Sequence, residues 1–447
     1  MPLDPQTLTE ALLSAARKAG AEAADAVAVE TRAQSINVRA GTLEQAERSE
    51  SIEVGLRVFI GQRQACVGAS DTREDTLAML AERAVAMARE APEDAYAGLA
   101  APEQLARDWD VAALELHDPG PEPAAPDMQE AALALEAAAM GVTGVSQVQA
   151  AADHEVERMH MAATNGFSGG FTSSARSLSA VAIAGQGTGM QRDYDADTRV
   201  FAADLRTPEE IGTRAGERAA SMLDAKKPYT GSYPVLFDER VASTLIGHLL
   251  SAINGGSVSR GASWLMNRMG EPVLPEALSL IDDPLRSRAL GSQPFDAEGL
   301  PVAKRALVEN GVLKSWILDL STGRKLGLPS TGHARRAPSS VPSPLSTNVA
   351  LTQGDKSRED LMAEMGTGLL VTSMIGSTIN PNTGDYSRGA SGFWIENGEI
   401  AFPVNECTIA GSLPEMLRGI VPANDARPWK SRVVPSLLVE GLTLAGN

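Results

Sequence analysis

Aromatic and basic residues are too few in this sequence to build a nucleic-acid-binding surface. Aromatic residues make up 4% of the 447 residues, whereas single-stranded nucleic acid is bound by exposed rings that stack on its bases. The formal net charge is -18, and the densest basic pairs are Lys226-Lys227 and Arg335-Arg336. Because duplex binding requires clustered Lys and Arg against the phosphates, we expect no direct contact with nucleic acid.

Cysteines and long apolar runs are equally sparse. The sequence has 2 cysteines, Cys66 and Cys407, which are too few for the disulfide framework of a secreted domain. No run of about 18 apolar residues is present, so no segment is predicted to span a membrane. The N-terminal segment carries Asp4 and Arg17-Lys18 around a short apolar stretch, which predicts an amphipathic helix rather than a signal peptide. We therefore expect a cytoplasmic protein.

Helical and strand-like apolar spacings are both present and are segregated along the chain, which predicts an α+β fold. We expect mixed or antiparallel sheets with packed helices, and a C-terminal half rich in strands. The length favours two domains, 1–227 and 228–447. Helices are predicted at 6–19, 72–90, 127–140, 207–224, 238–253 and 358–365. The predicted strands of the first half are 27–33, 35–39, 51–59, 64–69, 145–152, 155–164, 177–184 and 188–195.

A weak internal repetition runs through the first half of the sequence. A strand, a turn, a second strand and an Ala/Arg/Glu-rich helix follow one another at 51–90 and again at 177–224. Duplication of a unit and the ordinary recurrence of such units in α+β domains both explain this pattern.

The histidines do not have the spacing of a zinc site. His154 and His160 are six residues apart, and on a strand this places them on one face but about 20 Å from each other. We interpret both as exposed strand histidines. His248 has no His or Glu four residues later, which favours a partly buried structural role. His333 lies in the Gly-flanked loop 330–336, where approach to a ligand and stabilisation of a turn are equal alternatives. No metal ligand is predicted on this chain.

The sequence gives no clear nucleophile or phosphate-binding motif. Residues 389–392, Gly-Ala-Ser-Gly, lack the spacing of a nucleophile elbow, and no Walker A motif is present. The Gly-rich turn 185–189 is not followed by a helix, which argues against a dinucleotide site. Cys407 has no histidine close to it in sequence. We therefore predict no catalytic residue.

The segment 383–400 concentrates polar residues between glycines and then enters a hairpin. Asn397-Gly398 between alternating apolar residues is a strong hairpin signal. Asp385 and Arg388 either pair to hold the loop, or belong to a Gly-lined strand edge that binds peptides by strand addition. Together with the loop around His333, this gives the candidate peptide-groove or loop residues Gly332, His333, Arg335, Arg336, Gly384, Asp385, Tyr386, Ser387, Arg388 and Gly389.

Several segments form a recognisable set: 164–167, 190–194, 321–334, 365–369, 384–400 and 402–411. In their residues and order they resemble the PmbA/TldD family of peptidase subunits, and its PmbA branch, also called TldE, in particular. The resemblance implies an N-terminal and a C-terminal α+β domain. It also implies a complex in which the TldD branch carries zinc on a helix, in the motif H-E-x-x-x-H, and in which both proteins degrade or trim peptides.

The sequence departs from the family's zinc motif. Residues 260–263, Arg-Gly-Ala-Ser, resemble the tail of that motif. Counting back without gaps places Ile246, Gly247 and Ser251 where the resemblance expects His, Glu and His. Ile and Gly cannot bind zinc, and Ser rarely does. We therefore expect a noncatalytic subunit without a cofactor of its own, whose zinc is carried by a TldD-like partner and whose substrate is a peptide or an unfolded polypeptide.

Two alternatives belong to other functional classes. One is a self-sufficient peptidase whose site is assembled by folding from Asp385, His333 and Cys407. The other is an acidic regulator of DNA gyrase. When the chain is alone, a homodimer is an alternative to the monomer.

Overall fold

The structure is a computed structural model that describes residues 4–446. Residues 1–3 and 447, the outermost residues of the two predicted domains, lie outside the described residues. Its α-helices are α1 (Pro5–Ala19), α2 (Glu74–Glu90), α3 (Val111–Leu114), α4 (Ala125–Met140), α5 (Pro208–Ser221), α6 (Glu239–Ala252), α7 (Gly255–Ser259), α8 (Leu320–Leu326), α9 (Arg358–Met365) and α10 (Leu413–Arg418).

The strands divide between the two halves of the chain. Those of the first half are β1 (Ala23–Arg39), β2 (Thr42–Ile60), β3 (Arg63–Ala69), β4 (Val145–Ala163), β5 (Ser168–Ala184) and β6 (Gln191–Arg199). Those of the second half are β7 (Gly231–Phe237), β8 (Leu280–Asp282), β9 (Arg305–Glu309), β10 (Val312–Leu313), β11 (Ala334–Arg335), β12 (Ser343–Pro344), β13 (Val349–Leu351), β14 (Gly368–Ile379), β15 (Asp385–Glu396), β16 (Glu399–Ser412), β17 (Val421–Pro422), β18 (Arg432–Val433) and β19 (Leu437–Ala445).

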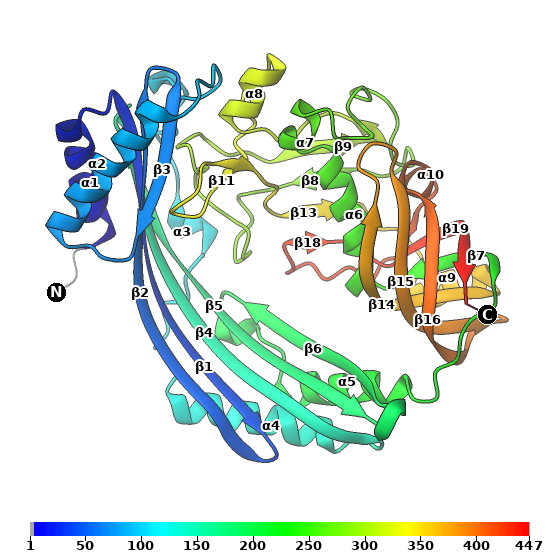
Figure 1. Ribbon diagram of the computed structural model, residues 1–447. Helices are drawn as coiled ribbons and strands as arrows, with labels where there is room; N and C mark the ends of the chain where they lie inside the picture. Colours follow the sequence, from blue (N-terminus) through cyan, green and yellow to red (C-terminus); the bar gives the residue numbers. More distant parts are fainter. Residues whose placement is uncertain (1–3, 447) are drawn as a thin grey trace.

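The first half forms one curved antiparallel sheet of 6 strands, in the order β3-β2-β1-β4-β5-β6. Figure 1 shows helices α1, α2, α4 and α5 on one face of this sheet, and the second half of the chain on the other. We call these the outer face and the inner face. The strands run from one helix pair to the other, so the inner face is a long surface open to the second half of the chain.

The internal repetition in the sequence corresponds to a repeated unit in the structure. A helix, three antiparallel strands and a second helix follow one another as α1-β1-β2-β3-α2, and again as α4-β4-β5-β6-α5. β1 and β4, the first strands of the two units, pair with each other in the middle of the sheet. The segments 51–90 and 177–224 are therefore the later parts of two topologically equivalent units.

The outer face has two separate apolar patches, and these explain a difference from the sequence-based prediction. α1 and α2 pack on one patch, which includes Ala26 and Leu56, while α4 and α5 pack on the other, which includes Val38 and Ala180. The apolar pattern changes where a strand passes between the patches. The pattern therefore predicts two strands at each of the single long strands β1 and β4.

The prediction that His154 and His160 are exposed is wrong. Both lie on β4, and their exposed fractions are 6% and 9%. Nδ1 of His160 lies 2.8 Å from Oγ1 of Thr9 on α1, because this helix covers that end of the outer face. Burial lowers the pKa of both histidines. Both are structural residues of the sheet.

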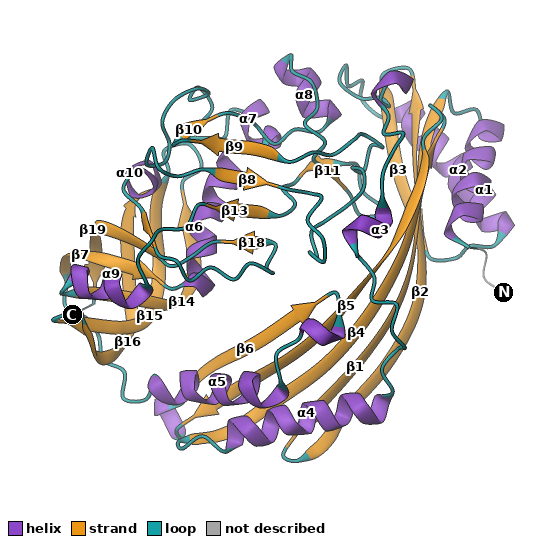
Figure 2. Ribbon diagram, turned by 180° about the vertical axis from the view of Figure 1, so that it is seen from behind, coloured by secondary structure: helices purple, strands orange, loops and turns teal. Residues whose placement is uncertain are grey.

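One long edge of the sheet has no neighbouring strand. β3 pairs with β2 only from Val54 to Ile60, and within the described residues no strand lies along the outer side of residues 42–53. This part of β2 is almost entirely exposed and carries Glu44, Glu47 and Glu50. Figure 2 shows β2 reaching well beyond the short strand β3.

The second half contains a closed barrel. Its strands are hydrogen-bonded in the order β16-β15-β14-β7-β19-β17, and an additional pairing of β16 with β19 closes the circle. β14 runs parallel to β7, so the sheet is mixed. The hairpin of β15 and β16 turns at Asn397 and Gly398, whose φ angles of 53° and 81° are those that an Asn-Gly turn favours.

A second sheet, β10-β9-β8-β13-β18, and helix α6 share a core with the barrel. The sequence did not indicate α8 and α10, because helices of 7 and 6 residues are too short to show a helical period. The predicted fold class is confirmed: α+β, with antiparallel and mixed sheets and a strand-rich C-terminal half. Within residues 4–446, no helix combines the length and apolarity needed to cross a membrane.

Candidate functional site

Helix α6 holds the positions where the family resemblance expects a zinc motif. Asp238 caps its N-terminus by accepting a hydrogen bond from the backbone N–H of Arg240. Ile246 has an exposed fraction of 0% and packs in the C-terminal core. Ser251 donates from its hydroxyl to the carbonyl oxygen of Gly247, one turn earlier, at 2.9 Å. Neither side chain is free to bind a metal ion in a groove.

Gly247 faces a guanidinium group. A Cβ atom built on Gly247 would lie 3.1 Å from Nη1 of Arg432, on β18. The space beside this turn of α6 is therefore taken by a cation, where a metal-activated water would need an anionic base. The groups present do not fit a zinc ion.

The next residue of α6, His248, contacts β15. The ring of His248 packs edge-on against Tyr386, with centroids 5.9 Å apart. Nε2 of His248 is buried and has no hydrogen-bond partner among residues 4–446. Burial, and then the charge of Arg388, lower the pKa of His248. Burial raises the pKa of Tyr386 to about 12, so both rings are neutral at pH 7.

The prediction of a strand edge at Gly384–Gly389 is wrong. β15 is hydrogen-bonded to β14 on one side and to β16 on the other, so it offers no edge for strand addition. Nor do Asp385 and Arg388 pair with each other. Asp385 accepts a hydrogen bond from Oγ1 of Thr383 at 2.6 Å, and Nε of Arg388 donates to the carbonyl oxygen of Gly376 at 2.7 Å.

Three residues of this segment have structural roles. Gly384 has a φ angle of 80°, and a Cβ there would meet the ring of Pro414 at 2.7 Å. A Cβ on Gly389 would meet Ile375 at 2.6 Å. Ser387 lies between its two neighbouring strands, opposite Thr378 and Ala410. This part of the candidate set therefore fixes the barrel wall.

Cys407, His333 and Asp385 do not come together. Cys407 lies on β16 opposite Ala390, while Asp385 lies opposite Ser412, five positions along the same strand pair and so about 17 Å away. Burial raises the pKa of the Cys407 thiol to about 11, which disfavours the nucleophilic thiolate. The side chain of His333 contacts Asp282 on β8, which belongs to a different sheet. This geometry argues against a catalytic site built from the three.

His333 stabilises a turn. Its exposed fraction is 2%, with Nδ1 2.9 Å from Oγ1 of Thr331 and Nε2 2.9 Å from Oδ2 of Asp282. Asp282 also accepts hydrogen bonds from the backbone N–H and the hydroxyl of Thr347. Gly332 supports the same turn with a φ angle of 71°. Of the two roles left open by the sequence, the structure favours the turn.

Arg336 joins the two halves of the chain. Its guanidinium forms an ion pair with Asp25 on the inner face of the sheet. Asp25 also accepts a hydrogen bond from Nε of Arg57 on β2 at 2.7 Å. Although burial raises the pKa of Asp25, the two arginines lower it further, so its net shift is downward. All three side chains are at most 5% exposed.

Arg335 points into a cavity between the two halves. The cavity has a volume of about 240 Å³ and is lined from the sheet by Glu155, Glu157 and Ser173, and from the second half by Leu290 and Arg335. Burial, and then the neighbouring Glu155, raise the pKa of Glu157. The sequence analysis missed both glutamates. Their signal was the spacing Glu-x-Glu on a strand, which places both side chains on one face.

A buried carboxyl group lies close to the Asp25 cluster and gives a first prediction. Glu298 is 8% exposed, and its Oε2 accepts a hydrogen bond from the backbone N–H of Leu320 at 2.8 Å. Burial, and then the neighbouring Asp296, raise its pKa from 4.5 to about 8. The folded state therefore binds this proton more tightly than the unfolded state. The stability that it contributes is full below pH 4.5 and is lost as the pH rises to about 8.

Replacing Glu298 by Gln is expected to flatten this pH dependence. The amide has the same shape, can accept the same hydrogen bond and does not ionise. As the pH rises from 5 to 8.5, the free energy of unfolding of the variant should therefore increase by roughly 2–4 kcal/mol relative to that of wild type. Urea unfolding at a series of pH values measures this difference. Glu53→Gln, at an exposed position of β2, is the control and should follow wild type. Parallel curves for E298Q and wild type would contradict the prediction.

Within residues 4–446, no group of three or more His, Cys, Asp and Glu side chains is arranged to hold a metal ion. The candidate residues instead fall into two sets. One set, on β15 and α6, builds the barrel. The other, around Arg335 and Arg336, lies where the second half meets the inner face of the sheet. Arg335, with the two glutamates opposite, is the member that faces an open space.

Comparison with known proteins finds relatives over the whole chain. Three family models match: PmbA/TldA metallopeptidase domain 1 (residues 24–88), the central domain (118–223) and the C-terminal domain (230–446). Metalloprotease PmbA of Escherichia coli O157:H7 is 34% identical over 447 residues, which cover 100% of this chain and 96% of that protein. The metalloprotease PmbA homolog of Haemophilus influenzae is also 34% identical, covering 97% and 94%.

Two solved structures have the same fold. A candidate modulator of DNA gyrase from Bacteroides thetaiotaomicron superposes with a TM-score of 0.90 at 26% identity, covering 99% of this chain and 98% of that one. TldE from Thermococcus kodakarensis superposes with a TM-score of 0.84 at 22% identity, covering 98% and 100%. The likeness extends over both halves of the molecule.

Proposed function

Because this chain belongs to the PmbA/TldD family of metallopeptidases, we propose that it is the PmbA-type subunit of a two-protein cytoplasmic peptidase. The catalytic zinc is carried by a TldD-type partner, and this chain contributes the surface that holds the peptide. A metalloprotease TldD homolog is among its relatives, at 30% identity over 209 residues. The substrate is a peptide or an unfolded polypeptide.

The observation that carries this proposal is the composition of helix α6. Zinc is bound in proteins by Cys, His, Asp and Glu side chains, and a catalytic site keeps an open position for water. At the three positions in question, α6 has a buried Ile246, a Gly247 that faces Arg432, and a Ser251 bonded to its own helix. Hydrolytic chemistry that depends on a metal-activated water is therefore assigned to the partner.

The states of Cys407 and His333 also support assigning hydrolysis to the partner. Cys407 is 2% exposed and protonated at neutral pH, and the imidazole of His333 is held between Asp282 and Thr331. The inner face of the sheet carries Glu155 and Glu157, which line a cavity together with Arg335. This arrangement suits the binding and orientation of a substrate peptide rather than bond cleavage.

The test is peptidase activity and metal content of the purified full-length chain, alone and mixed with a TldD-type protein. We expect no stoichiometric zinc and no hydrolysis of an unstructured fluorogenic peptide by the chain alone. The mixture should hydrolyse it at least tenfold faster than the partner alone, and a chelator should abolish this activity. Chelator-resistant hydrolysis by the isolated chain would overturn the proposal and favour the self-sufficient peptidase.

A second candidate function, regulation of DNA gyrase, is favoured by the acidic net charge of -18 and by the description of the Bacteroides thetaiotaomicron relative. An acidic surface could compete for a basic site on gyrase, and salt would weaken this interaction because it screens exposed charges. Inhibition of DNA supercoiling by the pure chain, lost at high salt, would support this function. Supercoiling unchanged by an excess of the chain would exclude it.

A further inference from the structure

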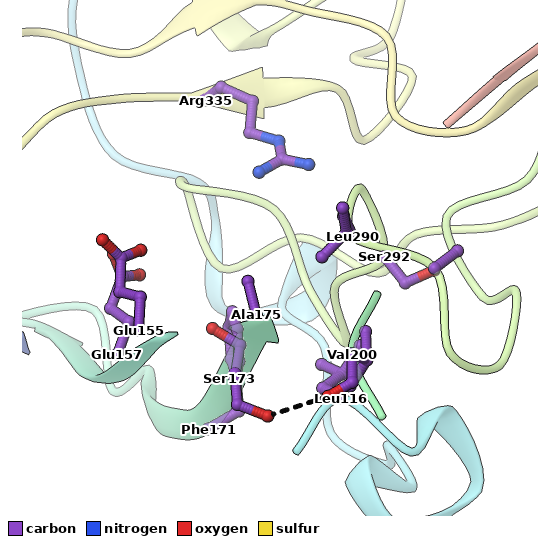
Figure 3. Close-up of a pocket in the computed structure, with 12 residues that line it drawn as sticks. Leu116, Glu155, Glu157, Phe171, Ser173, Ala175, Val200, Leu290, Ser292 and Arg335 are labelled. Carbon is purple, nitrogen blue, oxygen red and sulfur yellow. Dashed lines mark hydrogen bonds between the residues drawn. The ribbon is translucent and has the colours of Figure 1, made fainter. Parts of the chain in front are cut away.

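The cavity beside Arg335 has a composition that indicates a specific ligand. It lies between the inner face of the sheet and the second half of the chain (Figure 3). Three of its lining residues carry charge: Glu155, Glu157 and Arg335. The apolar part of the lining comes from Leu116, Phe171, Val200, Ala289 and Leu290. A ligand that fills it must therefore combine charge with an apolar group.

Both glutamates point into the cavity from one strand. They are two residues apart on β4, so they share a face, and their neighbours on β5 are the small residues Ala175 and Ser173. In Figure 3 the two glutamate side chains extend in the same direction and overlap in the view, and Glu155 is near enough to raise the pKa of Glu157. The small residues leave the carboxylates accessible, and their closeness makes a second negative charge costly without a cation between them.

Arg335 reaches the cavity from the opposite side. It extends from β11, and its Nη2 donates to the carbonyl oxygen of Gly291 at 2.7 Å. Its Nε is buried and has no hydrogen-bond partner among residues 4–446. Glu157 attracts Arg335 electrostatically, but among the described residues the ion pairs within 4.0 Å include none between Arg335 and Glu155 or Glu157. Arg335 and the two glutamates thus face each other across the cavity without direct contact.

The arrangement leaves polar groups that a ligand can satisfy. Glu155 is exposed and Glu157 and Arg335 are half-buried, but Nε of Arg335 is buried without a partner. A buried donor without an acceptor costs free energy. Here the backbone of β4 and the bond to Gly291 hold the two sides apart. A ligand that brings a cation to the glutamates and a hydrogen-bond acceptor to the arginine satisfies both sides.

We propose that this cavity binds the amino-terminal residue of a peptide. The terminal ammonium group lies between the carboxylates of Glu155 and Glu157, and the carbonyl oxygen of the same residue accepts a hydrogen bond from Arg335. An apolar side chain packs against Val200 and Leu290. The inference rests on the proposed function only in that peptides are the substrate class.

The size of the cavity limits the ligand to a short segment. Pockets that enclose drug-sized ligands have volumes of about 300–1,000 Å³, whereas this one has about 240 Å³. One residue fits, and the rest of the peptide continues outside. A lysine side chain carries a similar ammonium group but no carbonyl oxygen next to it, so it satisfies only the glutamates.

The experiment is calorimetric titration of the full-length chain, without partner, using three small probes. These are leucyl-alanine amide, its N-acetylated form, and N-acetyl-lysine amide. We expect the peptide with a free amino terminus to bind at least tenfold more tightly than either of the others. The amidated carboxyl end ensures that Arg335 is not simply binding a carboxylate.

Variants of the chain localise the binding. The double variant Glu155→Gln, Glu157→Gln is expected to lose at least tenfold in affinity for leucyl-alanine amide, and Glu53→Gln, on the same sheet, should bind as wild type does. Circular dichroism verifies that the double variant is folded. The comparison of probes on wild type stands even if the double variant does not fold.

Equal binding of the free and acetylated peptides, equal binding of N-acetyl-lysine amide, or no binding of any probe would each overturn the proposal. So would full affinity in the folded double variant. Because these titrations involve neither partner nor hydrolysis, their failure leaves the subunit role to be judged by the peptidase assay alone.

Discussion

Replacing Asp25 by Asn is expected to lower the free energy of unfolding by about 3–5 kcal/mol, the usual cost of breaking a buried ion pair. Asp25 forms ion pairs with both Arg57 and Arg336, and all three side chains are nearly inaccessible to water. Without its charge, the two buried guanidinium groups lose the carboxylate that they share. Urea unfolding of the full-length chain at pH 7 measures the loss.

Glu50→Gln is the matched control for this variant. Glu50 also pairs with an arginine, Arg48, at 3.0 Å, but both side chains are more than half exposed. An exposed pair contributes about 0–1 kcal/mol, so this variant should unfold close to wild type. If D25N were no less stable than E50Q, the cluster would not be what holds the loop of Arg336 to the sheet.

The second large effect is expected from Gly55→Ala. The position lies where the loop of Pro338 rests on β2, and an added Cβ would be 1.7 Å from the carbonyl oxygen of Pro338 and 2.9 Å from its Cα. The obstacle is backbone, so the loop must move away. Overpacking of this kind typically costs about 1–3 kcal/mol, and here we expect at least the upper value.

A thermal melt followed by circular dichroism measures this loss. Gly189→Ala is the control, because a Cβ there has no heavy atom within 4 Å and the backbone is not in the left-handed region. It should change stability by less than about 0.5 kcal/mol. Equal melting temperatures for the two variants would show that the loop yields without cost and that Gly55 is not required for close approach.

Local signals in the sequence were sufficient to place most helices and one turn. Thr207, Pro208 and Glu210 indicate a helix start, and the structure has α5 with both hydrogen bonds of a capping box. Helix α9 was predicted with the same bounds that the structure has. The Asn397-Gly398 turn was recognised because few residue pairs adopt its two positive φ angles. These features depend on neighbours in sequence, which a single sequence shows.

Long strands and the candidate site depend on residues far apart in sequence. The outer-face apolar pattern of β1 changes between Ala28, under α1, and Ile36, under α4, so it resembles two strands. Glu155 and Arg335 face each other only because β11 comes to lie over the inner face, 180 positions later in the chain. Tyr386 and Arg388 were singled out in the sequence as groove or loop candidates, but only the strand order places them in a barrel wall.

The unpaired stretch of β2 has a consequence for how this protein behaves at high concentration. A bare strand edge is a template on which further chains can add, and this is how many proteins begin to form fibres. Here Glu44, Glu47 and Glu50 repeat along the bare stretch, so a second copy that approaches it in register meets like charges. Although Arg48 pairs with Glu50, acidic side chains outnumber basic ones in this stretch, and charged side chains on a bare edge oppose the addition of further copies.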